Sequence, residues 1–256
     1  ARFYEGRAIQ GHIAGAMTKM VHTNTLKLFE RLIGPTKTSL AVKKARLIFS
    51  TVTDINLPEN PYPLSLNLSP EKFTQQEYTM SNHANVFSRE GMDIGSRFFL
   101  ETLVKSQPVS DEALSMVDLG CGNGIVGLIV AERFPNAQLH FVDESYMAVD
   151  SARINFQRAF PNRSAQFSAM DCLGELEENS VDMIMNNPPF HQQNVVGDFI
   201  AQQMFIESKK VLKQGGTLWV VGNRHLGYQG ALKRLMGNCT VIASNKKFVV
   251  LKSIKR

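Results

Sequence analysis

The sequence predicts an α/β protein whose C-terminal part, from about residue 71, is a mostly parallel β-sheet covered by helices. Three observations carry this prediction. Beyond about residue 87, segments with strand and helix patterns alternate along the chain. A glycine-rich turn at 118–124 joins a predicted strand to a predicted helix. The last two predicted strands are joined by so short a turn that they can only be antiparallel to each other.

The N-terminal part is predicted to form a separate domain, residues 1–70. Apolar spacing over 23–33 predicts a helix that ends at the following Gly-Pro pair, and residues 44–52 predict a strand. Residues 56–70 contain four prolines, which is typical of a linker or an extended crossing segment. The domain boundary is therefore placed near residue 70.

The C-terminal part, residues 71–256, is predicted to contain seven strands. Helices are expected at 93–106, 124–133, 146–159, 198–212 and 229–236. The first strand is expected to end at Asp118, and the others to span 137–142, 165–170, 181–186, 216–221, 239–244 and 247–253. Phe205 and Trp219 are expected in the core. The antiparallel ending separates this sheet from a plain dinucleotide-binding fold.

Composition narrows the class of protein. The chain has 256 residues, of which 43% are hydrophobic and 20% charged, as in soluble globular proteins. No apolar run approaches the roughly 18 residues of a membrane helix, so no membrane partner and a cytoplasmic location are expected. The three cysteines form no CxxC pair, and neither disulfides nor a metal site is expected.

The positive charge is concentrated near the beginning of the sequence. Residues 1–56 contain nine Lys/Arg and three Asp/Glu, whereas the remainder contains 19 and 20. The net charges are therefore +6 and −1. Such asymmetry suggests a polyanionic partner such as nucleic acid, although a solvated basic helix face gives the same pattern.

The turn at 118–124 reads DLGCGNG and lies where open α/β sheets bind ligands, beyond the carboxyl end of a strand. Asp118 precedes the first glycine, and a carboxylate there suits the ammonium and sulfonium groups of S-adenosylmethionine but would repel a pyrophosphate. The stretch 122–127 also matches G-x-G-x-x-G, with Asp143 about 20 residues on, as in a nicotinamide-binding fingerprint.

Acidic residues at later strand ends favour S-adenosylmethionine. Asp143 is placed to bind the ribose hydroxyls, and Asp171 is placed to accept a hydrogen bond from the adenine amino group. Taken singly, these acids could instead be helix caps. The predicted cofactor-binding residues from this region are Asp118, Gly120, Gly122, Asn123, Gly124, Asp143, Glu144, Asp171 and Cys172.

Residues 187–190 (NPPF), after the strand at 181–186, indicate the reaction. An amine attached to a ring is a poor nucleophile because its lone pair is delocalised. Hydrogen bonds from its hydrogens to the Asn187 amide oxygen and the Pro188 carbonyl would make the nitrogen more nucleophilic. Pro188 and Pro189 supply no N–H donors, and Phe190 offers a face for stacking a base. These four residues are the predicted catalytic residues; Asn187 is also expected to contact the cofactor.

His191 follows this motif. It is a candidate for taking the released proton, with an ordinary surface role as the alternative.

Together, these two motifs resemble the bacterial ribosomal RNA guanine-N2-methyltransferases. Residues 87–96 (FSREGMDIGS) strengthen the resemblance because they are similar to the family segment F-S-R-x-G-x-D-x-G-S. The resemblance implies a class I, Rossmann-like methyltransferase with a seven-stranded, mostly parallel sheet and S-adenosylmethionine as cofactor. It also implies that Phe87, Arg89, Asp93 and Gly95 lie around the cofactor or the substrate mouth.

The resemblance extends over the whole chain. It implies that the N-terminal domain is methyltransferase-like, lacks its own cofactor site and recognises RNA. The chain looks like the C-terminal two-thirds of a longer protein, and a monomer is expected. The member acting on 23S rRNA is the most similar, followed by the 16S member.

Two other functions remain open from the sequence. The NPPF motif also suits methylation of adenine N6 in a nucleic acid or of a glutamine amide in a protein, because the nitrogen lone pair is delocalised in both. A non-enzymatic RNA-binding module is the third possibility, against which the intact Asp118, Asp143, Asp171 and Asn187 argue.

Overall fold

The computed structural model describes residues 12–18, 22–42, 45–68, 73–74, 76–87, 91–189 and 195–256. The chain forms two compact units that divide between Pro61 and Tyr62. This division precedes the predicted boundary near residue 70, because strand β4 (Leu64–Leu68) pairs with β5 (Tyr78–Asn82) and so belongs to the C-terminal unit.

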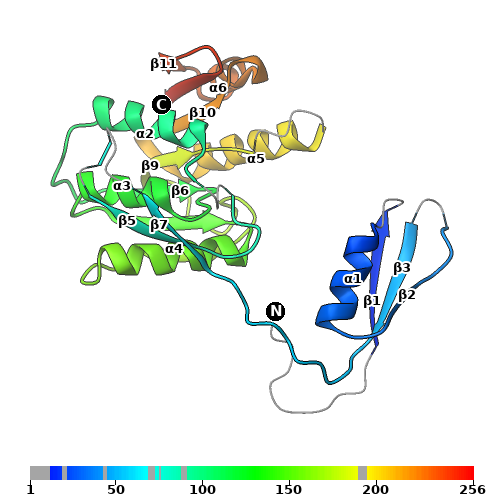
Figure 1. Ribbon diagram of the computed structural model, residues 1–256. Helices are drawn as coiled ribbons and strands as arrows, with labels where there is room; N and C mark the ends of the chain where they lie inside the picture. Colours follow the sequence, from blue (N-terminus) through cyan, green and yellow to red (C-terminus); the bar gives the residue numbers. More distant parts are fainter. Residues whose placement is uncertain are drawn as a thin grey trace. The chain divides into compact units, whose positions relative to one another are not determined.

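The N-terminal unit contains a three-stranded antiparallel sheet in the order β1-β3-β2. Its elements are β1 (His12–Thr18), α1 (Thr23–Leu32), β2 (Thr36–Thr38) and β3 (Ala45–Thr51). Helix α1 contacts β2 and β3 and lies along the sheet (Figure 1). The predicted helix and strand are confirmed, whereas β1 and β2 were not predicted.

A seven-stranded sheet in the order β11-β12-β10-β9-β6-β7-β8 forms the centre of the C-terminal unit (Figure 1). The strands are β6 (Ser115–Leu119), β7 (Gln138–Asp143), β8 (Gln166–Ala169), β9 (Val181–Asn186), β10 (Leu212–Asn223), β11 (Thr240–Ser244) and β12 (Phe248–Ile254). Strand β12 is antiparallel to both of its neighbours, and β10, β9, β6, β7 and β8 are parallel. The predicted fold class is confirmed.

Helices cover both faces of this sheet. They are α2 (Ile94–Ser106), α3 (Ile125–Arg133), α4 (Tyr146–Ala159), α5 (Val195–Val211) and α6 (Tyr228–Met236), with the short 3-10 helix η1 (Arg224–Leu226) after β10. Alternate strand residues point to opposite faces, and the core is accordingly divided in two. Met185 and Trp219 pack in the cluster that contains α2, α3 and α4 side chains. Ile184 and Leu218 pack in the cluster that contains α5 and α6 side chains, including Phe205.

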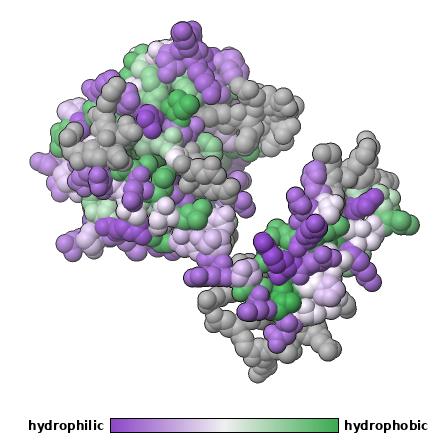
Figure 2. Space-filling view, in the orientation of Figure 1, coloured by the Kyte–Doolittle hydropathy of each residue, from purple (hydrophilic) through white to green (hydrophobic). Residues whose placement is uncertain are grey.

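The surface of each unit carries many polar residues. In Figure 2, hydrophilic residues are spread over the visible faces of both units, with smaller hydrophobic areas between them. None of the helices in the described part of the chain is long and apolar enough to cross a membrane.

Candidate functional site

A cavity of about 820 Å³ opens at the carboxyl ends of the parallel strands. Strand β6 lies between β9 and β7, so the strand order reverses beside β6. Ligands of open α/β sheets bind at such switch points. The cavity is lined by Asp143, the last residue of β7, and by Gly120, Asp171 and Asn187 from the loops after β6, β8 and β9.

The turn between β6 and α3 is held close to β7. The backbone N–H groups of Gly120 and Cys121 donate to the Val142 carbonyl at 2.8 and 3.0 Å. Gly122 has a φ of 54°, in the left-handed region that favours glycine. Gly122 and Asn123 line the cavity, so the backbone here can approach a ligand closely.

Asp118 fastens this turn to the helix that follows. Its side chain is only 3% exposed, and its Oδ2 accepts from the Gly127 N–H at 2.8 Å. Gly127 is packed so tightly that a Cβ there would lie 2.2 Å from Phe141 Cε1. Gly127, the last glycine of the G-x-G-x-x-G match at 122–127, therefore allows close packing of α3 on the sheet rather than contact with a ligand.

Burial also changes the acidity of Asp118. Desolvation, opposed by the hydrogen bond from Gly127 and reinforced by the negative charge of Asp143, raises its pKa to about 7. A cation in the cavity would favour the ionised carboxylate, because opposite charges attract strongly where water is excluded. Asp118 lines the cavity and can therefore contribute to binding a positively charged ligand.

Asp143, at the end of β7, links two of the loops. Its Oδ2 accepts from the Gly122 N–H at 3.0 Å and its Oδ1 from the Ser145 N–H at 2.9 Å. The side chain is half-buried and lines the cavity. It can fix the loops and still offer a carboxylate to neighbouring hydroxyl groups.

Three further predicted residues line the cavity. Glu144 and Asp171 are exposed, and Asp171 Oδ2 accepts from Gln203 Nε2 at 3.3 Å. Cys172 is buried, and desolvation, together with the nearby acids Glu207, Asp171 and Glu144, raises the pKa of its thiol to about 12. The thiol is therefore neutral at physiological pH and acts as a small apolar wall residue.

Asn187 follows β9 and presents its amide at the cavity wall. Its Nδ2 donates to Ser96 Oγ in α2 at 2.9 Å. Its Oδ1 is buried and has no hydrogen-bond partner among the described residues. A buried amide oxygen without a partner is costly, so a donor on a bound molecule would stabilise this arrangement.

The first turn of α2 orients that amide. Asp93 is the N-cap of α2, and its Oδ2 accepts from the Ser96 N–H at 3.0 Å. Ser96 thus holds Asn187 through its hydroxyl while Asp93 holds Ser96 through its backbone. Ser96 lines the cavity and was not predicted as a site residue, although the helix start that carries it was recognised.

Most of the predicted site residues come together around this cavity. Those that line it are Asp93, Asp118, Gly120, Gly122, Asn123, Asp143, Glu144, Asp171, Cys172, Asn187, Pro188 and Pro189. Among the described predicted residues, Gly95 and Gly124 do not line it. Gly95 is buried within α2, and a Cβ on Gly124 would lie 2.9 Å from the Ala152 Cβ, so both pack against protein. Arg89, Phe190 and His191 lie outside the described residues.

Two parts of the wall were not predicted. The β4–β5 hairpin and the loop after it contribute Leu66, Leu68, Asn85, Val86 and Phe87, of which only Phe87 was expected near the site. The edge formed by β10 and β12 contributes Asn223, Lys247 and Phe248. The alternation at Leu64, Leu66 and Leu68 could have indicated the first strand of the hairpin.

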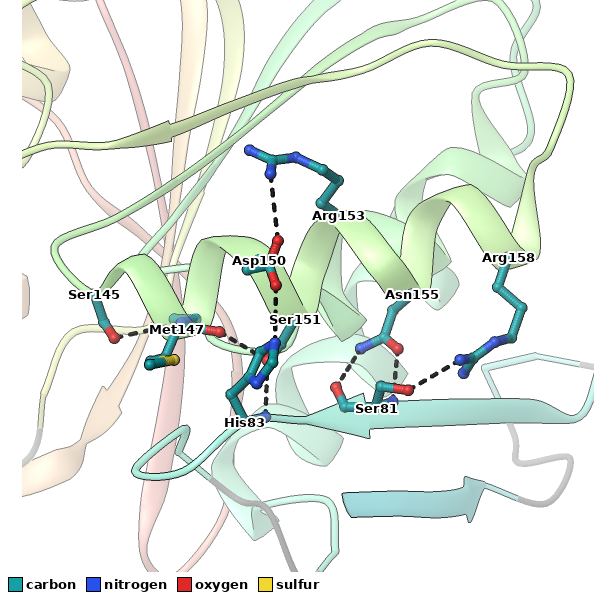
Figure 3. Close-up of polar contacts among 10 residues, drawn as sticks. Ser81, His83, Ser145, Met147, Asp150, Ser151, Arg153, Asn155 and Arg158 are labelled. Atoms are coloured by element: carbon teal, nitrogen blue, oxygen red, sulfur yellow. Dashed lines mark hydrogen bonds and ion pairs between the residues drawn. The ribbon is translucent and has the colours of Figure 1, made fainter. Parts of the chain in front are cut away.

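Polar side chains of α4 hold β5 in place (Figure 3). Asn155 Oδ1 accepts from the Ser81 N–H at 2.6 Å, and its Nδ2 donates to the Ser81 carbonyl at 3.0 Å. The same Nδ2 also donates to the Asn123 carbonyl at 2.9 Å. Asn155 therefore connects the glycine turn to the hairpin, with partners 32 and 74 residues away in sequence.

His83, just beyond β5, makes a second set of contacts with α4. Its N–H donates to Ser151 Oγ at 3.0 Å, and its Nε2 lies 2.8 Å from Asp150 Oδ2 (Figure 3). These contacts fix the hairpin against α4.

Comparisons with known proteins agree with this architecture. Residues 77–252 match the family model of the methyltransferase small domain, and residues 9–54 match that of the RLMG N-terminal domain. A protein named ribosomal RNA large subunit methyltransferase G from Pseudoalteromonas translucida is 51% identical over 245 residues, which cover 95% of this chain and 62% of the relative. The protein of that name from Yersinia pestis is 49% identical, with 95% and 60% covered. The chain thus spans about three-fifths of the length of these relatives.

Solved structures show the same fold. The 16S rRNA N2 methyltransferase RsmC of T. thermophilus, in complex with AdoMet and guanosine, has a TM-score of 0.79 and 24% identity. The likeness covers 97% of this chain and 66% of that one. M. jannaschii TYW2, in complex with AdoMet, has a TM-score of 0.53 and 12% identity, with 77% and 88% covered.

Proposed function

Since the chain belongs to the methyltransferase small domain family, we propose that it methylates the exocyclic N2 amine of a guanine in 23S ribosomal RNA. The methyl donor in this proposal is S-adenosylmethionine. The relatives named as large-subunit methyltransferases are 49–51% identical, whereas the 16S methyltransferase structure is 24% identical. This difference favours the large-subunit RNA over the 16S alternative.

The residues of the cavity fit such a cofactor. Asp118 supplies a buried carboxylate beside a turn whose Gly120 and Gly122 line the cavity, and Asp143 and Asp171 supply carboxylates near the ends of two later strands. The cofactor is a nucleoside that carries an ammonium and a sulfonium group, and these carboxylates complement its cations and hydroxyls. When bound, S-adenosylmethionine supplies an electrophilic methyl group.

The proposal rests mainly on the Asn187 side-chain oxygen, which has no hydrogen-bond partner among the described residues. It is a buried acceptor on the cavity wall, and its amide is already oriented by Ser96. An amine hydrogen that donates to it would satisfy the oxygen and draw the nitrogen lone pair out of conjugation with the ring. Holding that nitrogen in a fixed position contributes to the rate through proximity and orientation.

Pro188 and Pro189 continue this wall without adding donors. Both line the cavity, and neither has a backbone N–H that could compete with the substrate for the Asn187 oxygen. We propose that the Pro188 carbonyl accepts the second amine hydrogen and that Phe190 stacks on the base. The proton becomes acidic once the methyl group has transferred, so no strong general base is needed in the cavity.

The N-terminal unit is proposed to bind the RNA. Residues 1–56 carry the net charge of +6, and residues 9–54 match the RLMG N-terminal domain. Basic surfaces bind nucleic acids mainly through phosphate contacts. The proposed substrate is a cytoplasmic RNA, so we propose a cytoplasmic location. We also propose that the protein acts as a monomer.

Incubation with methyl-labelled S-adenosylmethionine tests the class of substrate. The purified chain is offered deproteinised 23S rRNA and 16S rRNA in separate reactions, and label is counted in RNA and in protein. The expected result is label in 23S rRNA. Label confined to protein would support the glutamine alternative, and label in 16S rRNA alone would move the substrate to the small subunit. Calorimetry with S-adenosylmethionine is a second check, because a folded chain that does not bind it cannot be the enzyme proposed.

A further inference from the structure

A shallow depression of about 480 Å³ adjoins the cavity described above. It is lined by Asn223, Arg224, His225, Lys246 and Lys247. Asn223 and Lys247 also line the larger cavity, so the two are continuous along these side chains. Neither Arg224, His225 nor Lys246 has a role in the proposed methyl transfer.

The topology of the sheet brings these residues to the ligand-binding edge. Strand β12 runs antiparallel to β10, so β12 begins at the edge where β10 ends, and Asn223 pairs with Phe248. The turn before β12 therefore carries Lys246 and Lys247 to the edge that also carries Asn187. The 3-10 helix η1 starts at Arg224, directly after β10.

Hydrogen bonds fix the turn against η1. The Arg224 N–H donates to the Lys247 carbonyl at 3.0 Å, and Arg224 Nη1 donates to the Asn245 carbonyl at 3.3 Å. Asn245 Oδ1 accepts from the N–H groups of Lys247 and Phe248 at 2.9 and 2.7 Å. A backbone ordered in this way loses little conformational freedom when a ligand binds.

The depression is positively charged and lacks acidic residues in its lining. Arg224, Lys246 and Lys247 are exposed, and within the described residues no carboxylate forms an ion pair with them. Three cations without an ion-pair partner among the described residues, two on the turn and one at the start of η1, complement phosphate groups. Lys247 of this turn also lines the cavity, and a turn that only kept the protein soluble would not need to do so.

Asn223 adds a different kind of group. Its side chain is 5% exposed, and its Oδ1 is buried without a hydrogen-bond partner among the described residues. An acceptor of this kind does not suit a phosphate oxygen, but it suits a hydroxyl. The ribose 2′-hydroxyl can donate to it, and that group distinguishes RNA from DNA.

We propose that Asn223, Arg224, Lys246 and Lys247 bind the sugar–phosphate backbone of the RNA strand next to the methylated guanosine. The inference rests on the proposed function, because the guanine is taken to enter the adjoining cavity. Arg224, Lys246 and Lys247 contact backbone phosphates, and Asn223 accepts a hydrogen bond from a ribose hydroxyl. The site thus deepens the proposal by assigning the path of the strand.

Salt dependence of RNA binding tests the lysines. The whole chain is titrated with a short single-stranded RNA that contains guanines, at several salt concentrations, and compared with the double variant Lys246→Gln/Lys247→Gln. Each phosphate contact on a single strand contributes about 0.7 to the slope of log K against log salt, so the loss of two contacts lowers the slope by about 1.4. The double variant Lys233→Gln/Arg234→Gln removes the same charge from exposed positions of α6 and should keep the original slope.

A DNA strand of the same sequence tests Asn223. Asn223→Ala is expected to bring the RNA and DNA affinities closer together, because only RNA donates the 2′-hydroxyl. The lysine variant is expected to weaken both strands alike. Thermal unfolding and calorimetry with S-adenosylmethionine show whether each variant is folded, and the single variant Lys246→Gln serves if the double variant is not.

Equal slopes for the wild type and the lysine variant, or an equal fall in the α6 control, would overturn the assignment. If Asn223→Ala prefers RNA over DNA as strongly as the wild type does, the proposed contact between Asn223 and the ribose hydroxyl is wrong. These results are independent of methylation. If the chain methylates RNA and the lysine variant keeps the wild-type slope, the proposed function stands and this site is wrong. If the lysine variant loses slope but the chain does not methylate RNA, the site binds RNA and the proposed function is wrong.

Discussion

At the scale of single residues, the site depends on a short series of hydrogen bonds that begins at a helix cap. The Asp93 side chain accepts a hydrogen bond from the Ser96 N–H, and the Ser96 hydroxyl accepts one from the Asn187 amide. Asn187 lines the cavity, and its buried Oδ1 has no hydrogen-bond partner among the described residues. The order of these contacts explains why a segment 91 residues before Asn187 bears on the chemistry. We therefore propose that Ser96 is a positioning residue that orients the Asn187 amide.

Asn187→Ala is expected to lower the rate of methyl transfer by at least on the order of 100-fold, which is typical for loss of one preorganised polar contact. Cofactor affinity should stay nearly unchanged, because the cavity wall beside the carboxylates remains. Labelled-methyl assays and calorimetry measure the two quantities. Parallel loss of both would contradict the role of the Asn187 oxygen.

Ser96→Ala is expected to lower kcat while leaving Asn187 in place, because the amide loses its fixed orientation. Ser96→Thr keeps a hydroxyl and serves as the matched variant. Equal activity of the alanine variant and the wild type would show that Ser96 does not position the amide.

Asp118 makes folding stability depend on pH. Its pKa is about 7 in the folded protein against a usual 3.8, so between these values the folded state binds more protons than the unfolded state. Its contribution to stability is therefore largest at low pH and is lost as the pH rises from about 4 to about 7. Asp118→Asn should lack this part of the pH dependence in denaturant titrations. The same slope in the variant and the wild type would contradict the assigned pKa.

At the scale of elements, the cavity depends on loops that are tied to one another. Asp143 joins the turn before α3 to the turn before α4, and Asn155 joins the first of these turns to β5. The strand and helix pattern could be predicted from local sequence, and the helix at 146–159 agrees with α4 at both ends. The contacts of Asn155 could not be predicted, because its partners are distant in sequence and no periodic pattern indicates them.

Strands β4 and β5 show the same limit. The prolines of 56–70 indicate an extended segment, but a two-stranded hairpin is recognised only when both strands are identified. Strand β5 reads YTMSN, with four of its five residues buried, so it lacks the alternation of a half-exposed strand. Its burial comes from α4 rather than from its own pattern.

Asp143→Ala is expected to weaken cofactor binding, because the Gly122 and Ser145 N–H groups lose their acceptor and the cavity loses a carboxylate. Asp143→Asn keeps one acceptor oxygen and should lose less affinity. Calorimetry with S-adenosylmethionine measures both. Unchanged affinity in the alanine variant would exclude Asp143 from the cofactor site.

Gly127→Ala is expected to destabilise the protein by about 1–3 kcal/mol, because the added methyl group would overlap the Phe141 ring. Gly230→Ala on α6 is the matched control. Its Cβ would approach no closer than 3.5 Å to the Arg234 guanidinium, and it should stabilise the helix by about 0.5–1 kcal/mol. Thermal unfolding compares the two, and a Gly127→Ala variant as stable as the wild type would contradict the packing.

At the scale of the whole molecule, two compact units carry separate parts of the proposed function. The C-terminal unit contains the cavity, and residues 1–56 contain the excess of positive charge. Both the cofactor site and the basic N-terminal part could be predicted from the sequence, because the glycine turn and the Lys/Arg residues can be identified without knowing the fold. The basic depression beside the cavity was not predicted, since Arg224 and Lys247 are brought together only by the antiparallel pairing of β10 and β12.

The central claim is that the Asn187 oxygen receives the N2 amine of a guanine. Nucleoside mass spectrometry of 23S rRNA, after incubation with the chain and S-adenosylmethionine, tests it most directly. The account predicts N2-methylguanosine with the wild type and none with Asn187→Ala. Formation of N6-methyladenosine, or equal N2-methylguanosine with the variant, would contradict it.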